Sequence, residues 1–149
     1  VILYAGEVII MSYTRDNWPR DRWPNFGFGE LVCSESGINR MHTDTMDRLQ
    51  RVRSAYGRGM TISSGYRDVT HPIEAAKIAK SGNAGAHSTG RAVDIAVRGG
   101  DAVRLLQLAL AEGFTGIGIQ QKGEGRFIHL DDIQPEDEFH VPRPWIWSY

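Results

Sequence analysis

Cysteine is nearly absent from the sequence, and the one present, Cys33, cannot form an internal disulfide. It lies in the apolar run Glu-Leu-Val-Cys, so we expect a buried thiol that packs as a small hydrophobic side chain. An excess of one charge sign is also missing, because 17 Lys and Arg stand against 18 Asp and Glu, for a formal net charge of -1. The basic residues are scattered and form no run with interleaved aromatics, so we expect no nucleic-acid partner.

Long hydrophobic runs are missing as well. The apolar residues 1–10 are too short to span a bilayer, and they lack the basic segment and small-residue cleavage site of a signal peptide. We therefore predict no membrane span and see no signal peptide. Residues 1–10 are interpreted either as an extension before a start at Met11 or as an added edge strand.

The length and composition fit one soluble globular domain. With 149 residues, 41% of them hydrophobic, the chain can bury a core without disulfide bonds or other cross-links. We predict a single domain over 1–149, present as a monomer, with an irregular N-terminal arm over 1–27 that its aromatic residues anchor. The tail over 132–149 is rich in Pro and Trp, and we expect it to wrap the surface, its aromatic residues locking it in place rather than binding sugar.

Hydrophobic spacing predicts three helices, over 38–56, 72–80 and 101–112. Proline is favoured in the first turn of a helix, which supports a start at Pro72, and Asp101 is the expected cap of the third helix. The first and third helices should each pack through one apolar stripe. The predicted stripes are Ile38, His42, Thr45, Leu49, Val52 and Tyr56 in the first, and Val103, Leu106 and Leu110 in the third.

Strands are predicted over 60–64, 91–97, 115–120 and 126–131. Together with the helices they predict an α+β fold, in which a small antiparallel sheet carries the functional site and is flanked by helices. Side chains alternate between the two faces of a strand. In the second strand Asp94 therefore lies opposite an aliphatic Val-Ile-Val row.

The last strand has the same two-faced character, because His129 and Asp131 lie opposite an Ile-Leu pair. If the two strands are neighbours, Asp94 and His129 can converge on one ion, which His87 can reach from the preceding loop. Two imidazoles and a carboxylate are three of the four ligands of a catalytic zinc, whose fourth position stays open for water.

Taken singly, each of these residues has a simpler interpretation. A loop histidine more often forms a surface hydrogen bond, and a strand aspartate more often lies at an edge or a turn. Asp94 fits the simpler interpretation least, because its neighbours are apolar and a buried carboxylate requires a strong partner.

Three motifs, in this order, resemble those of the zinc D-alanyl-D-alanine metallopeptidases. They are Ser64-Gly-Tyr66-Arg67, Gly85-Ala-His87-Ser-Thr-Gly90-Arg-Ala92-Val-Asp94 and Phe127-Ile-His129-Leu-Asp131. The family includes bacterial D,D-carboxypeptidases, L,D- and D,D-endopeptidases and phage endolysins, and it shares a fold with the amino-terminal domain of hedgehog proteins. The resemblance extends over about residues 28 to 131.

The resemblance implies a zinc-dependent peptidase that hydrolyses stem or cross-link peptides of bacterial peptidoglycan, as a D-Ala-D-Ala carboxypeptidase or as an endopeptidase. By this resemblance His87, Asp94 and His129 are the zinc ligands. Arg67 would hold the substrate carboxylate or the developing oxyanion, a role that suits a fixed positive charge. Ser64 and Tyr66, in the same motif, would contact the substrate.

The sequence departs from the family pattern at two places. Gly85 stands where the family often has serine, and Arg126 stands where many members have the acidic general base. By alternation Arg126 also points away from the site. The base is therefore left open between Asp131, which shares the face of His129, Glu124 in the preceding turn, and some other group. Asp131 has a second interpretation, as a group that orients a ligand.

The remaining histidines, His42, His71 and His140, are assigned structural roles. We expect the protein to act outside the bacterial cytoplasm, in the periplasm or cell wall. Because no signal peptide is visible, the expected route is delivery by a phage virion or a lysis system, and the alternative is a cellular periplasmic enzyme trimmed of its signal. The alternative function is a non-catalytic, metal-stabilised module that binds a peptide or protein on the same fold. The missing acid at position 126 favours that alternative.

Overall fold

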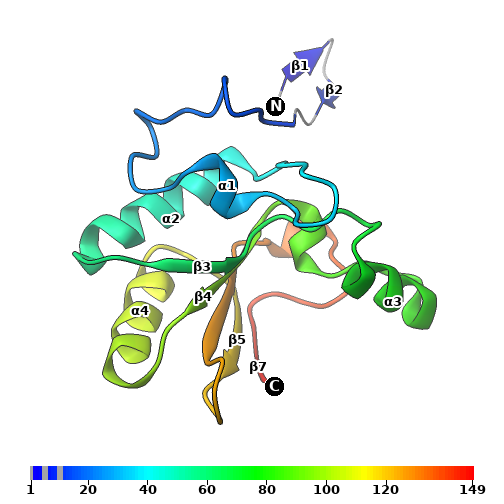
Figure 1. Ribbon diagram of the computed structural model, residues 1–149. Helices are drawn as coiled ribbons and strands as arrows, with labels where there is room; N and C mark the ends of the chain where they lie inside the picture. Colours follow the sequence, from blue (N-terminus) through cyan, green and yellow to red (C-terminus); the bar gives the residue numbers. More distant parts are fainter. Residues whose placement is uncertain (1, 5–6, 10–11) are drawn as a thin grey trace.

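The computed structural model describes residues 2–4, 7–9 and 12–149, and its main feature is a five-stranded sheet with the strand order β3-β4-β6-β5-β7 (Figure 1). The strands are β3 (Thr61–Ser64), β4 (Ala92–Ala96), β5 (Gly116–Gln120), β6 (Phe127–Asp131) and β7 (Trp145–Ser148). The pairs β3–β4, β4–β6 and β6–β5 are antiparallel. The predicted α+β fold with a small sheet is confirmed, and all four predicted strands belong to this sheet.

The fifth strand was not predicted. β7 lies in the tail that was expected to wrap the surface, and it pairs in parallel with β5, with Gly118 opposite Trp147. A short 3-10 helix, η2 (Pro135–Asp137), precedes it. The tail therefore extends the sheet at the β5 edge. Its backbone groups form hydrogen bonds with β5, whereas in an irregular surface segment they would bond to water.

The helices are α1 (Phe28–Leu31), α2 (Thr43–Tyr56), α3 (Pro72–Ser81) and α4 (Gly99–Ala111). Figure 1 shows α2 and α4 toward one end of the sheet and α3 toward the other. α3 begins with Pro72 as predicted, and its N-cap is His71, whose ring nitrogen accepts from the amide of Ile73. This contact confirms the structural role expected for His71.

α2 begins later than predicted, at Thr43, because the preceding residues are held by other partners. Asn39 bridges to Tyr13, and the amide of His42 donates to the carbonyl of Gly90. The residues before Thr43 therefore do not continue the helix, although Ile38 and His42 fall on the helical stripe. The rest of that stripe, from Thr45 to Tyr56, is buried as predicted.

The predicted packing face of α4 is wrong. Val103 and Leu110 are 58% and 54% exposed, and the buried face instead carries Ala102, Leu105 and Ala109. This helix is apolar on more than one side, so periodicity alone does not select a face. The alanines are on the inner side because α4 packs closely against α2.

The core lies between α2, α4 and the aliphatic face of the sheet, and the N-terminal arm closes it. Trp18, Trp23 and Phe26 in that arm are buried, which confirms their predicted anchoring role. Cys33 is buried in the same cluster, as expected.

The first residues form a separate hairpin. β1 (Ile2–Tyr4) pairs with β2 (Glu7–Ile9), so they are not an edge strand of the main sheet. The proposed start at Met11 lies outside the described residues. Within the described part of the chain, no helix is long and apolar enough to cross a bilayer.

Candidate metal centre

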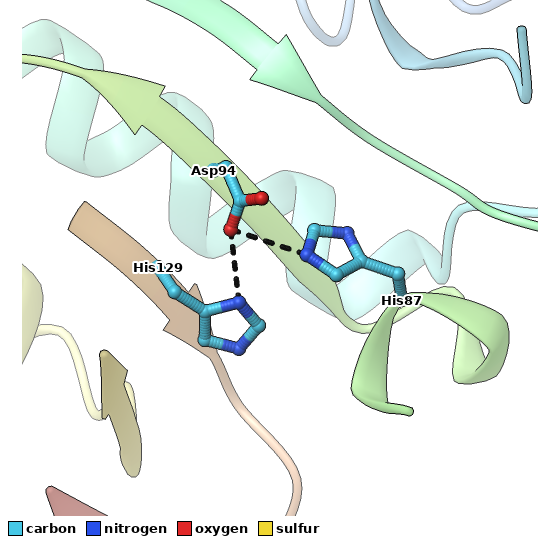
Figure 2. A group of neighbouring side chains, drawn as sticks. All are labelled: His87, Asp94 and His129. Atoms are coloured by element: carbon cyan, nitrogen blue, oxygen red, sulfur yellow. Dashed lines mark hydrogen bonds and ion pairs between the residues drawn. The ribbon is translucent and has the colours of Figure 1, made fainter. Parts of the chain in front are cut away.

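Asp94 and His129 lie directly opposite each other on neighbouring strands, as the alternation argument required. Asp94 Oδ1 lies 3.0 Å from His129 Nδ1 and 3.1 Å from His87 Nε2 (Figure 2). One ligand-type atom from each of the three residues lies within 4.8 Å of the other two, and all three side chains are buried. The cluster can therefore hold one metal ion.

Local sequence patterns place these three groups. In β4 and β6 the alternate residues Val93, Ile95 and Ile128 are buried in the core, which forces Asp94 and His129 onto the opposite face. His87 lies in the 3-10 helix η1 (Ala86–Thr89), which leads directly into β4.

The outer nitrogen of His87 fixes the orientation of its ring. His87 Nδ1 lies 2.7 Å from the carbonyl oxygen of Gly65, which can only accept, so Nδ1 carries the proton. Burial lowers the pKa of His87 below its ordinary value, so the ring is neutral near pH 7. A neutral ring protonated at Nδ1 presents the bare lone pair of Nε2 to Asp94.

The outer nitrogen of His129 is held by a carboxylate instead. His129 Nε2 lies 3.0 Å from Asp131 Oδ2, and both oxygens of Asp131 accept from Arg143, at 2.8 and 2.7 Å. Burial raises the pKa of Asp131, but the hydrogen bonds from His129 and Arg143 outweigh burial and lower it, so Asp131 is ionised. The His129 Nε2–H therefore donates to Asp131, and Nδ1 faces Asp94.

The two imidazoles converge on an ionised carboxylate. Burial raises the pKa of Asp94, but its contacts with His129 and His87 outweigh burial and hold the pKa well below its ordinary value. Contacts with Asp131 and Asp94 likewise outweigh burial at His129 and raise its pKa, which favours a positive charge on or beside this ring. A metal ion bound by the inner nitrogens and the carboxylate would supply such a charge, and this donor set, two imidazoles and one carboxylate, fits zinc.

Arg67 lies beside the cluster, from the turn that follows β3. Its guanidinium lies 3.3 Å from Asp94 Oδ2 and 3.4 Å from Glu74 Oε1, and 15% of its side chain is exposed. Glu74, from α3, is fully buried and also accepts from the amide of Gly85 at 2.6 Å. Two buried carboxylates thus hold the Arg67 guanidinium at the edge of the metal cluster.

A cleft of about 590 Å³ opens over these residues. His87, Asp94, His129 and Arg67 line it on one side. The C-terminal tail supplies the facing side, through Phe139, His140, Val141, Arg143, Trp145, Trp147 and Tyr149. The cleft therefore presents the candidate metal centre to molecules of peptide size, against a largely aromatic wall.

Two glycines in β5 make room for the groups around His129. A Cβ at Gly116 would collide with the Asp131 carboxylate, and a Cβ at Gly118 would lie 2.7 Å from the Trp147 indole. Trp147 in turn packs against the His129 ring, with ring centroids 5.1 Å apart. The Gly-Ile-Gly-Ile pattern thus has a steric cause, which the sequence argument did not identify.

The structure does not support either predicted general base. Asp131 is fully buried, lies beyond the outer nitrogen of His129, and is bound to Arg143 at both oxygens. Its position matches the alternative interpretation, in which it orients the ligand. Glu124 is exposed in the turn between β5 and β6, and it lines a surface hollow with Arg126 rather than the metal cleft.

Of the three residues predicted to contact the substrate, one lines the cleft and two do not. Arg67 lines the cleft, whereas Ser64 and Tyr66 do not. Tyr66 is a core residue whose hydroxyl donates to Asp68, and Ser64 pairs with Asp94 in the β3–β4 ladder. Both therefore support the loop and the sheet that position Arg67.

His140, to which the sequence analysis assigned a structural role, is exposed and lines the cleft. Trp145 and Trp147 belong to β7, and the amide of Tyr149 donates to the carbonyl of Ile119 just beyond that strand. All three aromatic residues line the cleft as well. Periodicity could not show either fact, because the tail has no repeating pattern of its own.

A buried pair of imidazoles and a carboxylate beside an open cleft defines a site that can hold a catalytic metal ion. The sequence model of the Peptidase M15 family matches residues 25–131. The chain belongs to this family, which confirms the resemblance drawn from the three motifs, and it is a metallopeptidase of the general zinc-dependent kind. The matched segment includes all three cluster residues and ends before the tail that walls the cleft. A comparison with curated proteins finds no match.

Proposed function

We propose that this protein is a zinc-dependent peptidase that hydrolyses stem or cross-link peptides of bacterial peptidoglycan. The observation that carries the proposal is the buried His87, Asp94 and His129 cluster, which lines a cleft of about 590 Å³ beside Arg67. Membership of the peptidase family supports peptide hydrolysis. The peptidoglycan substrate rests on the resemblance of the motifs.

In this proposal His87 Nε2, His129 Nδ1 and an oxygen of Asp94 hold the zinc ion. Bound zinc polarises the scissile carbonyl and lowers the pKa of a water ligand toward about 7. Gly65 and Asp131 accept from the outer ring nitrogens and so aim the inner nitrogens at the ion. Arg67 holds a substrate carboxylate or the developing oxyanion.

The proton acceptor must line the cleft, which excludes Glu124 and the enclosed Asp131. Among the described residues that line it, Asp94 is the one carboxylate, and it belongs to the metal cluster. His140 is the imidazole of the cleft outside that cluster. We therefore assign proton transfer to His140, since histidine is the commonest general base.

The proposed place of action is the periplasm or cell wall, since peptidoglycan lies there, with a phage particle or lysis system as the expected route of delivery.

Digestion of purified muropeptides, followed by mass spectrometry, tests the proposal. We expect the zinc-loaded protein to release peptide fragments, and we expect no release after chelation or from the His87→Ala variant. The fragment masses identify the bond that is cut. Full activity in the chelated protein or in the variant would contradict the proposal.

The second candidate is a metal-stabilised binding module without hydrolysis. The absence of a second free carboxylate among the described cleft residues favours it. If the zinc-loaded protein binds muropeptides but yields no new fragment on long incubation, this candidate replaces the first.

A further inference from the structure

Lys77 is a cation that the metal centre does not use. It lies in α3, lines the same cleft as the candidate ligands, and has a side chain that is 42% exposed. Its ammonium donates to Glu74 Oε1 at 3.0 Å. An ammonium has three donors, so Lys77 keeps donors that can face the cleft.

One face of α3 forms the wall in which Lys77 lies. Ile73, Lys77 and Ser81 are spaced four residues apart and all line the cleft, as expected for neighbours along a helical face. The aromatic tail lines the cleft as well. A peptide in the cleft therefore meets apolar groups of α3 and of the tail, and a single ammonium on the α3 side.

Gly85 explains how Lys77 reaches this position. A Cβ at Gly85 would collide with the Lys77 ammonium and would lie 3.1 Å from Glu74 Oε2. Gly85 stands two residues before His87, where the family often has serine. Glycine at position 85, where the family often has serine, therefore leaves the space that the Lys77 ammonium occupies.

The positive charge on this side of the cleft exceeds the negative charge once the metal ion of the proposed function is counted. Arg67 and Lys77 both contact Glu74, a fully buried carboxylate, and Arg67 also contacts Asp94. Arg143, the other cation that lines the cleft, pairs with Asp131. Lys77 therefore shares its one carboxylate with Arg67, while Asp94 is shared between Arg67 and the metal ion. The remaining positive charge can attract an anionic group of the substrate.

Accepting the proposed function, we propose that Lys77 is a specificity-determining residue that binds a carboxylate of the substrate peptide. Stem peptides carry several carboxylates, and each is free or amidated depending on the wall. Lys77 would select peptides in which one particular carboxylate is free. Gly85 contributes by leaving space for the ammonium beside the metal centre.

Binding measurements on zinc-loaded protein test this proposal. The probes are stem tetrapeptides in which each carboxylate is amidated in turn, together with the fully acidic parent. The variant Lys77→Gln keeps an N–H donor for Glu74 and removes the charge. We expect it to bind the acidic parent about tenfold more weakly, which corresponds to one charge-assisted hydrogen bond.

The peptide that is amidated at the carboxylate contacted by Lys77 should bind equally to the wild-type protein and to Lys77→Gln, because it lacks the charged group that Lys77 binds. Gly85→Ser should reproduce the loss for the acidic parent, since its side chain displaces the ammonium. Lys80→Gln, on an exposed position of the same helix that does not line the cleft, should leave binding unchanged.

Equal weakening of all peptides by Lys77→Gln would overturn the proposal and would assign Lys77 only to holding Glu74. No weakening would overturn it as well. Cleavage of muropeptides by the wild-type protein is a separate measurement. If the wild-type protein does not cleave muropeptides, the proposed peptidase function is rejected. If it cleaves them but Lys77→Gln weakens the binding of no peptide selectively, only the role of Lys77 is rejected.

Discussion

Asp131 acts on the metal centre through His129. Its carboxylate receives the outer N–H of the ring at 3.0 Å and is itself held by Arg143 at both oxygens. An ionised partner fixes which nitrogen is protonated and makes the facing nitrogen a better ligand. Asp131 is therefore a positioning residue, and its loss should be seen first in metal affinity.

We predict that Asp131→Asn lowers zinc affinity by about 10- to 100-fold, the range for loss of such a partner. It should also lower the free energy of unfolding by about 3–5 kcal/mol, because Arg143 becomes a buried charge without its counterion. Chelator competition and denaturant unfolding measure the two effects. Raising the zinc concentration should restore much of the activity. An activity loss that excess zinc cannot restore would instead make Asp131 the general base.

For the proton acceptor we predict that His140→Gln lowers kcat by about 10²- to 10⁴-fold, the usual contribution of a general base, while zinc stoichiometry stays unchanged. Glu124→Gln is the matched control, because Glu124 is exposed on the hairpin away from the cleft. Steady-state kinetics on one muropeptide distinguish the two variants. If Glu124→Gln removed activity and His140→Gln did not, the assignment would be reversed.

Strand β5 supports the metal centre although it supplies no ligand. Its two glycines on the site face leave space for the Asp131 carboxylate and for the Trp147 indole. Trp147 packs on the His129 ring, and β7 is held in register by its pairing with β5. A side chain at Gly116 or Gly118 would therefore move Asp131 or the tail.

We predict that Gly118→Ala displaces Trp147 and lowers the free energy of unfolding by about 1–3 kcal/mol, as overpacking does. Gly100→Ala, in the first turn of α4 with open space around it, is the control. It should leave stability equal or slightly higher, because alanine is the better helix former. Denaturant unfolding of both variants gives the comparison. A Gly118→Ala protein as stable as wild type would contradict the close packing of Trp147.

The elements that local patterns determine could be predicted from the sequence. β4 and β6 alternate aliphatic and ligand-type residues, and this alternation alone brought Asp94 and His129 to one face. The buried face of α4 could not be predicted, because the helix has apolar residues on more than one side and its packing against α2 selects the face that is buried. β7 could not be predicted either, since a strand at an edge depends on its partner.

The molecule combines a segment that the family shares with a tail that lies beyond the family match. Residues 25–131 carry the candidate ligands and Arg67. The tail supplies β7, the Arg143 that holds Asp131, and most of one wall of the cleft. Motifs in the sequence could therefore locate the metal centre, whereas the shape of the cleft depends on residues outside every motif.

Metal binding should stabilise the whole molecule, since an ion that binds only the folded state shifts the folding equilibrium. At a free zinc concentration about 100-fold above Kd, the gain is about 2.7 kcal/mol, which raises Tm by roughly 5–11 °C for a chain of this size. Thermal unfolding with and without zinc measures the shift. The His87→Ala variant should show little of it, and an equal shift in that variant would place the ion elsewhere.

Anomalous diffraction at the zinc absorption edge, from crystals of the zinc-loaded protein, locates the ion directly. We expect one peak among His87 Nε2, His129 Nδ1 and an Asp94 oxygen, at about 2.0–2.2 Å from each, with a further position open to the cleft. A peak at another site, or none at this cluster in zinc-saturated crystals, would contradict the proposed metal centre.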